Sequence, residues 1–213
     1  MKTITLTFDN GPDPVVTPQV LDVLSQHSIQ STFFVLGDKL RDRRAATVRA
    51  HAEGHWVGNH TFNHIVPLGM ASEVSFSRSE ILRTAALIDD LAHSRKFFRP
   101  FGGGGNLDKR LLNTEALEVL LAEKFTCVLW NAIPQDWAYP RNWVDRAMQL
   151  CRQQNETLMV LHDLPTGAMD RLDTFIRQAK DEGFTFEQDF PAAYVPIECG
   201  VLRHPVDAIL TTN

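Results

Sequence analysis

The sequence predicts a single α/β domain built around parallel strands. Short apolar strand candidates alternate with helix candidates about six or seven times, which is the pattern of βα units. No linker or repeat divides the 213 residues. The polar residues of chemical interest follow strand candidates, and sites in parallel α/β folds gather at the carboxyl ends of strands. Unrelated surface residues would fall at both strand ends.

The first half of the chain contains three strand candidates and two helix candidates. Residues 4–8 alternate as a strand, and residues 31–36 form a near-continuous apolar run that suits a strand buried on both faces. Residues 55–59 give a third, short strand. Residues 18–27 carry apolar side chains at helical spacing. Asp38 is a candidate cap for a helix that runs to about residue 52.

The second half continues the alternation. Helices are expected at 72–93, 108–123, 140–154 and 169–182, and strands at 97–98, 125–130, 157–161 and near 184. Gly102 to Gly105 form an unbroken glycine run without a nucleotide-binding pattern, so a flexible loop at the rim of a site is expected. No regular structure is expected from Pro191 onward.

The composition excludes several classes of protein. Hydrophobic residues make up 44% and charged residues 22%, as in soluble globular domains, and the net charge of -5 argues against nucleic-acid binding. No run of 18 apolar residues predicts a membrane span. The strand follows Met1-Lys2 without an apolar signal segment, so a cytoplasmic location is expected.

The three cysteines do not suggest a disulfide or a thiolate metal site. Cys127, Cys151 and Cys199 lie far apart and form no CxxC pair. This spacing is typical of reduced thiols that are mostly buried.

The first strand ends in two adjacent polar residues, Asp9 and Asn10, followed by a Gly-Pro turn. Successive strand residues point in different directions, so one can face a reacting water and the other a metal. A surface turn would use the same residue types. Asp9 is the candidate general base.

Two histidines, His60 and His64, are four residues apart directly after a strand candidate. At this spacing two neutral imidazoles can converge on zinc, or on cobalt or nickel. Solvated loop histidines would give the same spacing.

Three further strand ends carry groups that suit the same chemistry. Arg99 could keep Asp9 ionised, or form a surface ion pair of little energetic weight. Asp136-Trp137 could orient a histidine beside an aromatic wall, or cap a helix next to a core tryptophan. His162 could act as a general acid whose pKa a carboxylate raises, or simply end a strand.

Taken together and in order, these segments resemble the polysaccharide deacetylase family, carbohydrate esterase family four. The family motif TFDDGP corresponds to Thr7-Phe-Asp-Asn-Gly-Pro12, and H[ST]xxH to His60-Thr-Phe-Asn-His64. The Arg-Pro-aromatic-Gly motif corresponds to Phe98-Arg-Pro-Phe-Gly102, one residue shorter than the common form. Asp136-Trp137 and Leu161-His-Asp163 correspond to the last two motifs. The matches extend from residue 7 to 163.

The resemblance implies a distorted (β/α)7 barrel in which residues 1–213 form one catalytic domain, and metal-assisted removal of an N- or O-acetyl group. Asp9 would activate a metal-bound water, and Arg99 would orient it. His162 would protonate the leaving group and be tuned by Asp136. The resemblance implies that His60 and His64 bind the metal, that Trp137 and Leu161 line the acyl pocket, and that Phe101 contacts the substrate.

The chief departure from the family pattern is Asn10, which stands where the family has a metal-binding aspartate. An amide oxygen can still bind a metal, but the site loses one negative charge. We therefore expect weaker binding of a divalent metal, zinc above all, and a more Lewis-acidic metal when it is bound. Because the third motif is shorter and a glycine run follows it, the family pattern does not define the shape of the active-site groove, and so not the substrate.

The leading hypothesis is a hydrolase of a non-peptide C–N bond, acting on an N-acetylated sugar or oligosaccharide. A small-amide hydrolase is an alternative. A second alternative is a carbohydrate-binding relative that lost the metal because of Asn10. Retention of Asp9, Arg99, Asp136 and His162 argues against it, because a binding protein needs neither a base nor a separate acid. Neither the substrate nor the oligomeric state follows from the sequence.

Overall fold

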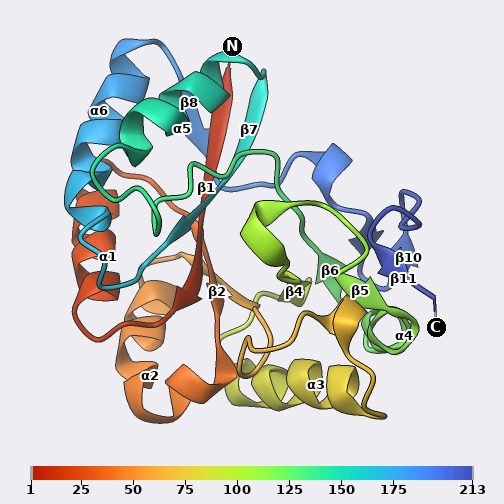
Figure 1. The fold of residues 1–213 in the computed structure, drawn as a ribbon. Coiled ribbons are helices and arrows are strands. Elements are labelled where there is room, and N and C mark those ends of the chain that lie inside the picture. Colours follow the sequence, from red (N-terminus) through yellow and green to blue (C-terminus); the bar gives the residue numbers. More distant parts are fainter. Residues whose placement is uncertain (1, 213) are drawn as a thin grey trace.

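The protein is built on one curved, mostly parallel sheet (Figure 1), and the computed structural model describes residues 2–212. Within the described residues the sheet has nine strands, and β1 pairs with β2 on one side and with β7 and β8 toward one end of the strand order. Its parallel strands are β1 (Thr3–Gly11), β2 (Thr32–Val35), β3 (Trp56–Asn59), β4 (Phe97–Phe98), β6 (Thr126–Cys127), β7 (Glu156–His162) and β8 (Thr185–Glu187).

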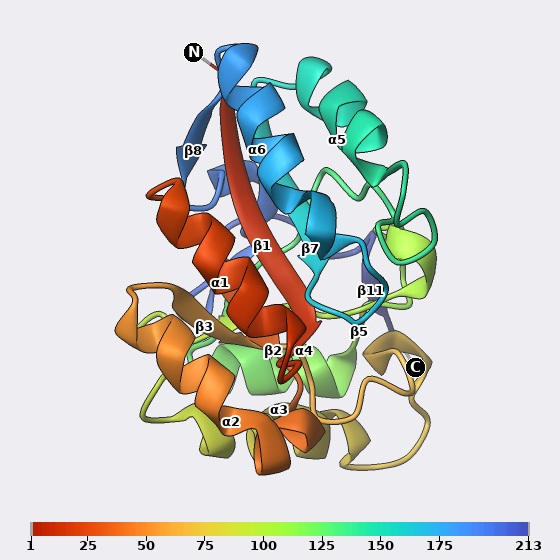
Figure 2. The ribbon, with the colours of Figure 1, turned by 90° about the vertical axis from the view of Figure 1, so that its left-hand side faces the viewer.

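Six α-helices are found in the described residues, and most follow a parallel strand. They are α1 (Val16–Gln26), α2 (Gly37–Ala52), α3 (Phe76–Ile88), α4 (Thr114–Ala122), α5 (Trp143–Arg152) and α6 (Leu172–Asp181). Figure 2 shows α1 and α6 on either side of β1, with α5 beyond α6 and α2 below α1. The main hydrophobic core fills the space between these helices and the sheet. None of the helices in residues 2–212 is long and apolar enough to cross a membrane.

The sheet curls into the distorted barrel that the sequence predicts. Beyond β6, the chain returns to β7 through an isolated parallel bridge between Ala132 and Met159. The backbone N–H of Val160 donates to the carbonyl of Ala132 at 2.9 Å. This bridge connects the two ends of the parallel array, so the carboxyl ends of the strands surround a common centre.

The strand register places the predicted site residues next to one another. Asp9 at the end of β1 lies opposite His162 at the end of β7. Asn59 at the end of β3 lies opposite Phe98 in β4, so the next residues, His60 and Arg99, leave neighbouring strands together. Polar residues far apart in sequence thus meet because their strands are adjacent and parallel.

Two predicted helices are shorter than expected. The helix predicted at 108–123 begins only at Thr114, because the side-chain oxygen of Asn113 accepts the N–H of Ala116 at 2.8 Å and caps the helix there. Before it, β5 (Leu112–Asn113) pairs with β11 (Leu210–Thr211). The helix predicted at 72–93 spans only Phe76–Ile88.

Two further expectations are wrong. Asp38 does not cap α2 but lies in its first turn, where its charge is favourable to the helix dipole. The chain after Pro191 is not irregular throughout, because β9 (Ile197–Glu198) joins β6 antiparallel and β10 (Val201–Leu202) pairs with β9. Two-residue strands leave no periodicity in a sequence, which is why the pattern missed them.

Candidate active site

A cavity of about 260 Å³ lies at the carboxyl ends of the parallel strands and brings together residues from all five sequence motifs. A larger surface hollow of about 510 Å³ surrounds His55, where no predicted site residue lies. The chemistry therefore belongs to the smaller cavity. It is lined by Asp9, Asn10, His60, His64, Pro100, Phe101, Gly105, Trp130, Ile133, Trp137, Val160, His162 and Leu164.

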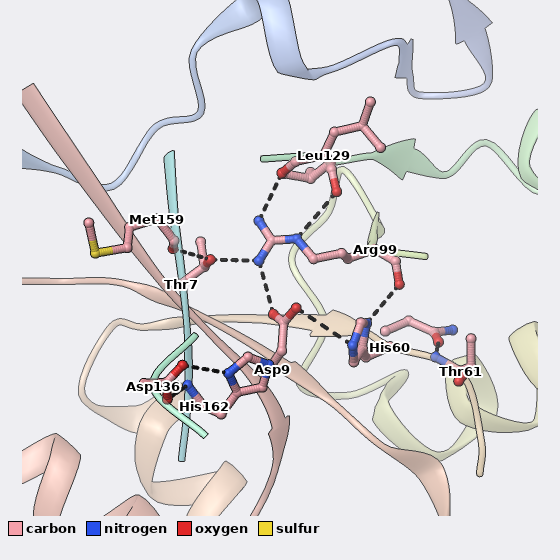
Figure 3. A network of polar contacts seen from close by, with 11 residues as sticks. Thr7, Asp9, His60, Thr61, Arg99, Leu129, Asp136, Met159 and His162 are labelled. Carbon is pink, nitrogen blue, oxygen red and sulfur yellow. Dashed lines mark hydrogen bonds and ion pairs between the residues drawn. The ribbon is translucent and has the colours of Figure 1, made fainter. Parts of the chain in front are cut away.

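Asp9 is held by a fully buried arginine. The Nη1 of Arg99 donates to Oδ1 of Asp9 at 2.9 Å and to the hydroxyl of Thr7 at 2.6 Å, while Nη2 donates to the carbonyl of Leu129 at 3.1 Å (Figure 3). Arg99 has no exposed surface, so it is not the exposed ion pair that was the alternative reading. Burial lowers the pKa of Arg99, and the charge of Asp9 opposes this effect.

The position of this pair decides how Asp9 can act. One carboxylate oxygen is bound to the guanidinium, and the other lies 3.6 Å from Nε2 of His60 (Figure 3). A guanidinium beside a carboxylate favours the ionised form. Asp9 is thus an oriented carboxylate at the edge of the cavity, with one oxygen left to accept a proton.

His60 is fixed in the tautomer that leaves Nε2 free. Its Nδ1 lies 2.8 Å from the carbonyl oxygen of Arg99, which can only accept a hydrogen bond. Nδ1 therefore carries the proton, and Nε2 presents its lone pair near Asp9. Burial lowers the pKa of His60, so the ring is neutral, as a metal ligand must be.

His64 stands beside His60, with the two ring centroids 5.0 Å apart. Phe101 stacks on its ring at a centroid distance of 3.7 Å and an angle of 20°. Burial, helped by the nearby His60, lowers the pKa of His64 to about 3. Both histidines of the second motif are therefore neutral imidazoles on the same cavity wall, and they are not solvated loop histidines.

Asn10 leaves the regular ladder of β1. The pairing with β2 passes from Asp9 directly to Gly11, so Asn10 is the extra residue of a bulge, and its φ is 69°. Asparagine tolerates this left-handed conformation better than most residues. Its side-chain oxygen is buried and has no hydrogen-bond partner within residues 2–212. The bulge thus lets Asp9 and Asn10 line one cavity although they are neighbours in a strand.

His162 and Asp136 form the second buried pair. The backbone N–H and the Nδ1 of His162 both lie 2.9 Å from carboxylate oxygens of Asp136, which is fully buried (Figure 3). Burial alone would lower the pKa of His162, but the hydrogen bond and charge of Asp136 raise it above its usual value. Asp136 therefore does not cap a helix, and Nε2 of His162 is left free for chemistry.

Two of the three predicted substrate contacts line the cavity, and one does not. Trp137 packs edge-on against His162 with the centroids 4.6 Å apart, and Phe101 lies on the opposite side against His64. Leu161 is fully buried in the main core instead of lining the pocket. Strand alternation explains this correction, because the neighbouring residues Val160 and His162 face the cavity and Leu161 faces the other way.

Sequence reasoning missed the residues that shape the loop between His60 and His64. The carboxylate of Glu80 accepts the backbone N–H groups of Phe62 and Asn63 at 3.1 and 3.0 Å. The side-chain oxygen of Asn59 accepts the N–H of Thr61 at 2.9 Å. Glu80 is buried on α3, and a charged residue on the apolar side of that helix was the signal that could have revealed it.

Trp130 and Ile133 were also missed as parts of the cavity wall, whereas Gly105 belongs to the glycine run expected at its rim. The indole N–H of Trp130 donates to the carbonyl of Gly105 at 2.8 Å and ties the glycine run to the site. Gly103–Gly105 form a single 3-10 turn at the rim, as expected of a rim loop. Trp130 is the last residue of the strand predicted at 125–130. Because site residues gather at the carboxyl ends of strands, its position in the sequence could have identified it.

The donors of the cavity fit a divalent metal. His60 and His64 offer neutral imidazoles, and Asn10 offers a buried amide oxygen that lacks a partner. Within residues 2–212, no three His, Cys, Asp or Glu side chains converge as a metal site. A metal here would therefore depend on the neutral oxygen of Asn10.

Comparisons with known proteins agree with this geometry. Residues 1–119 match the sequence profile of the polysaccharide deacetylase family. The chain is 31% identical over 183 residues to a peptidoglycan-N-acetylglucosamine deacetylase from Bacillus cereus, and the match covers 84% of this chain and 79% of that protein. Some of the curated relatives that it matches are longer, and the chain spans 37% of their length.

Solved structures show the same fold. A peptidoglycan N-acetylglucosamine deacetylase in complex with 4-naphthalen-1-yl-N-oxidanyl-benzamide superposes with a TM-score of 0.72 at 29% identity, over 87% of this chain and 85% of that chain. A family 4 acetyl xylan esterase from Clostridium thermocellum, in complex with a cobalt ion, superposes with a TM-score of 0.70 at 28% identity, over 88% of each chain.

Proposed function

The chain belongs to the polysaccharide deacetylase family, and we propose that it is a metal-assisted hydrolase that removes an acetyl group from an N-acetylated sugar or oligosaccharide. One observation carries the proposal. A carboxylate held by Arg99 and an imidazole held by Asp136 line the same cavity. Amide hydrolysis needs one group to take a proton from water and another to give a proton to the leaving amine.

The residues divide the reaction between them. Asp9 takes the proton of the attacking water, and Arg99 keeps the carboxylate ionised and aimed into the cavity. His162 then donates a proton from Nε2 to the leaving nitrogen, while Asp136 holds the ring and stabilises its charged form. Both pairs are buried, so neither the base nor the acid has to be reoriented during the reaction.

A metal would be held by His60, His64 and the side-chain oxygen of Asn10. When bound, a divalent cation acidifies water and polarises the acyl carbonyl. Zinc is the first choice for two imidazoles and one oxygen, and cobalt or nickel also suit this donor set. With an amide in place of a carboxylate, the set carries less negative charge, and we expect weaker binding than with aspartate at position 10.

The cavity suits a small acyl group next to a larger sugar. Trp137, Val160 and Leu164 provide apolar walls at the acid side, and Phe101 does so at the histidine side. Flat aromatic surfaces and apolar walls accept a methyl group but offer no partner for a charged one. Relatives named for N-acetylglucosamine make an N-acetylated hexosamine the leading substrate. A neighbour named as an acetyl xylan esterase makes an O-acetylated sugar the comparison substrate.

A second candidate function is carbohydrate binding without catalysis. The feature that favours it is Asn10, because a neutral third donor weakens the metal site. Against it stands the retention of both buried pairs, since burying Arg99 and Asp9 in full is costly without a chemical use.

The proposal is tested by acetate release from N-acetylglucosamine oligomers with zinc supplied. We expect release by the wild type, faster release by Asn10→Asp, and loss of both after chelation. Acetylated xylan serves as the comparison substrate. Oligosaccharide binding without acetate release by either protein would support the binding relative instead.

The zinc content of the two proteins gives a separate prediction. After dialysis against limiting zinc, Asn10→Asp is expected to retain more metal than the wild type, because a carboxylate restores one negative charge to the donor set. Metal analysis of both proteins checks this. Equal, stoichiometric zinc in both, with position 10 of the wild type still asparagine by peptide mass, would contradict the weaker binding expected of Asn10.

A further inference from the structure

The peptide bond between Asn10 and Gly11 lies beside two charged groups that the proposed reaction does not use. On one side, Nζ of the half-buried Lys39 donates to the carbonyl oxygen of Asn10 at 2.6 Å. That oxygen belongs to the same peptide group as the nitrogen of Gly11. A cation on the oxygen stabilises the anion that forms when the Gly11 N–H loses its proton.

On the other side, the carboxylate of Asp163 packs against Gly11. Only glycine fits there, because a β-carbon at position 11 would overlap both carboxylate oxygens. The Oδ2 of Asp163 accepts the hydroxyl of Thr17, whereas Oδ1 is buried without a partner. Burial raises the pKa of Asp163 to about 7, so this carboxylate can accept a proton near neutral pH. It is a buried carboxylate packed against Gly11, a residue that has no side chain of its own.

The side-chain oxygen of Asn10 is not tied to any other group in residues 2–212. No hydrogen bond fixes its carboxamide oxygen, and no side chain at position 11 blocks an approach of the Gly11 nitrogen to Cγ. Asn10 also lines the cavity at the strand ends. This is the only asparagine followed by glycine in the sequence.

We propose that the Asn10–Gly11 peptide is a self-modification site, at which Lys39 and Asp163 assist conversion of the asparagine to aspartate. The nitrogen of Gly11 bonds to Cγ of Asn10, and the bond from Cγ to Nδ2 breaks. Nδ2 leaves as ammonia with the proton that Gly11 gives up, and a five-membered imide ring remains.

Water then opens the ring. If it adds at Cγ, the bond to the Gly11 nitrogen breaks there, and an ordinary aspartate stands in an unchanged main chain. If it adds at the main-chain carbonyl, isoaspartate results. The net change is one water consumed and one ammonia released, without any oxidant or reductant.

The consequence for the site rests on the proposed function. Aspartate at position 10 would supply the carboxylate that the family motif has there, next to His60 and His64. The gene would then encode a metal site that is one charge short, and the chain itself would complete it. The neutral Asn10 would be the precursor and not the final state.

The test is ageing of the purified protein in ¹⁸O-labelled water, followed by peptide mapping that separates aspartate from isoaspartate. We expect label at position 10 with aspartate as the main product, and none at the exposed control Asn106. Zinc content, measured on the same samples, is expected to rise with the converted fraction.

Variants test whether Lys39 and Asp163 assist the conversion of Asn10. Lys39→Met is expected to slow conversion about tenfold, as loss of one charge-assisted hydrogen bond implies, and Asp163→Asn is expected to slow it as well. The exposed Lys109→Met is the matched control and should convert at the wild-type rate. Circular dichroism confirms that each variant is folded.

Three results would overturn the proposal. The first is an unlabelled Asn10 after an ageing time that fully converts a free peptide of residues 5–15. The second is an unchanged conversion rate in Lys39→Met, and the third is isoaspartate as the main product.

The variant Asn10→Asp separates this proposal from the proposed function. If that variant releases acetate while the wild type never converts, only the self-modification fails. If the wild type converts but Asn10→Asp releases no acetate, the proposed function fails instead.

Discussion

At the residue scale, the site is defined by two buried charged pairs with different tasks. Arg99 holds one carboxylate oxygen of Asp9, and the hydrogen bond and charge of Asp136 raise the pKa of His162. Arg99 binds Oδ1 of Asp9 and leaves Oδ2 on the side of His60. Asp136 binds Nδ1 of His162 and leaves Nε2 free for the cavity. The geometry therefore separates base from acid, which two exposed carboxylates or histidines would not achieve.

Replacement of Asp136 by asparagine gives a residue-scale prediction. Asp136 raises the pKa of His162, so the proton needed by the leaving group is lost only as pH rises through that raised value. In Asp136→Asn the pKa of His162 falls. The alkaline limb of the pH–rate profile is expected to move to lower pH, and kcat to drop about 100-fold.

The exposed Asp170→Asn is the control for that experiment and should leave the profile unchanged. An alkaline limb at the same pH in Asp136→Asn would mean that His162 is not the acid. If Asp136→Glu restores the alkaline limb to its wild-type pH, the effect of Asp136→Asn comes from the lost charge and not from a packing defect.

Much of the site could be predicted from the sequence because the chemistry selects the residue types. Asp9, His60, Arg99 and His162 stand out as polar residues directly after apolar strands. Asp9, His60 and His162 line the cavity, and Arg99 holds Asp9 from behind. Leu161 was misplaced because a motif gives order along the chain but not the face of a strand. Glu80 was missed because its role depends on which loop α3 happens to cover.

At the scale of elements, the bulge at Asn10 and the caps of the helices determine what the strands present. A regular strand would have turned Asn10 away from Asp9, and one extra residue corrects this. Such a bulge was not predictable, because Asp-Asn-Gly-Pro suits an ordinary turn equally well. The start of α4 was predicted several residues early for a similar reason, since Asn113 ends the preceding segment with a side-chain bond.

The cap of α4 gives an element-scale prediction. In Asn113→Ala, the N–H of Ala116 and the hydroxyl of Ser77 lose their acceptor. The free energy of unfolding is expected to fall by about 1 kcal/mol or somewhat more. Urea denaturation of the variant measures this loss.

Asn142→Ala is a matched control, because Asn142 precedes α5 but makes no side-chain capping bond. It should change stability by less than about 0.5 kcal/mol. Equal effects of the two substitutions would show that the Asn113 contact has no capping value.

At the scale of the whole molecule, the parallel register assembles the site. The alternation of strands and helices predicted parallel strands, and the family resemblance implied the barrel. The adjacency of β1 with β7 and of β3 with β4 then places the motifs side by side. The strand order itself was not readable from periodicity. The solved relatives share the barrel fold that the resemblance implied.

The chain beyond Pro191 belongs to this architecture. Ile197 is fully buried and packs with Leu120 and Phe125 at the edge of the sheet. Its replacement by alanine is expected to cost about 2–4 kcal/mol, the usual loss for a large buried aliphatic side chain. The half-exposed Val201→Ala is the control. Similar unfolding midpoints for both variants would mean that this segment adds nothing to the core.

The central claim is that the cavity at the strand ends performs metal-assisted deacetylation with Asp9 as the base. The most direct measurement is the rate of acetate release from an N-acetylglucosamine oligomer by zinc-loaded Asn10→Asp, with and without the added change Asp9→Asn. We expect Asp9→Asn to lower kcat by about 100- to 10,000-fold while zinc content is retained. An undiminished rate in Asp9→Asn, with zinc bound, would contradict the account.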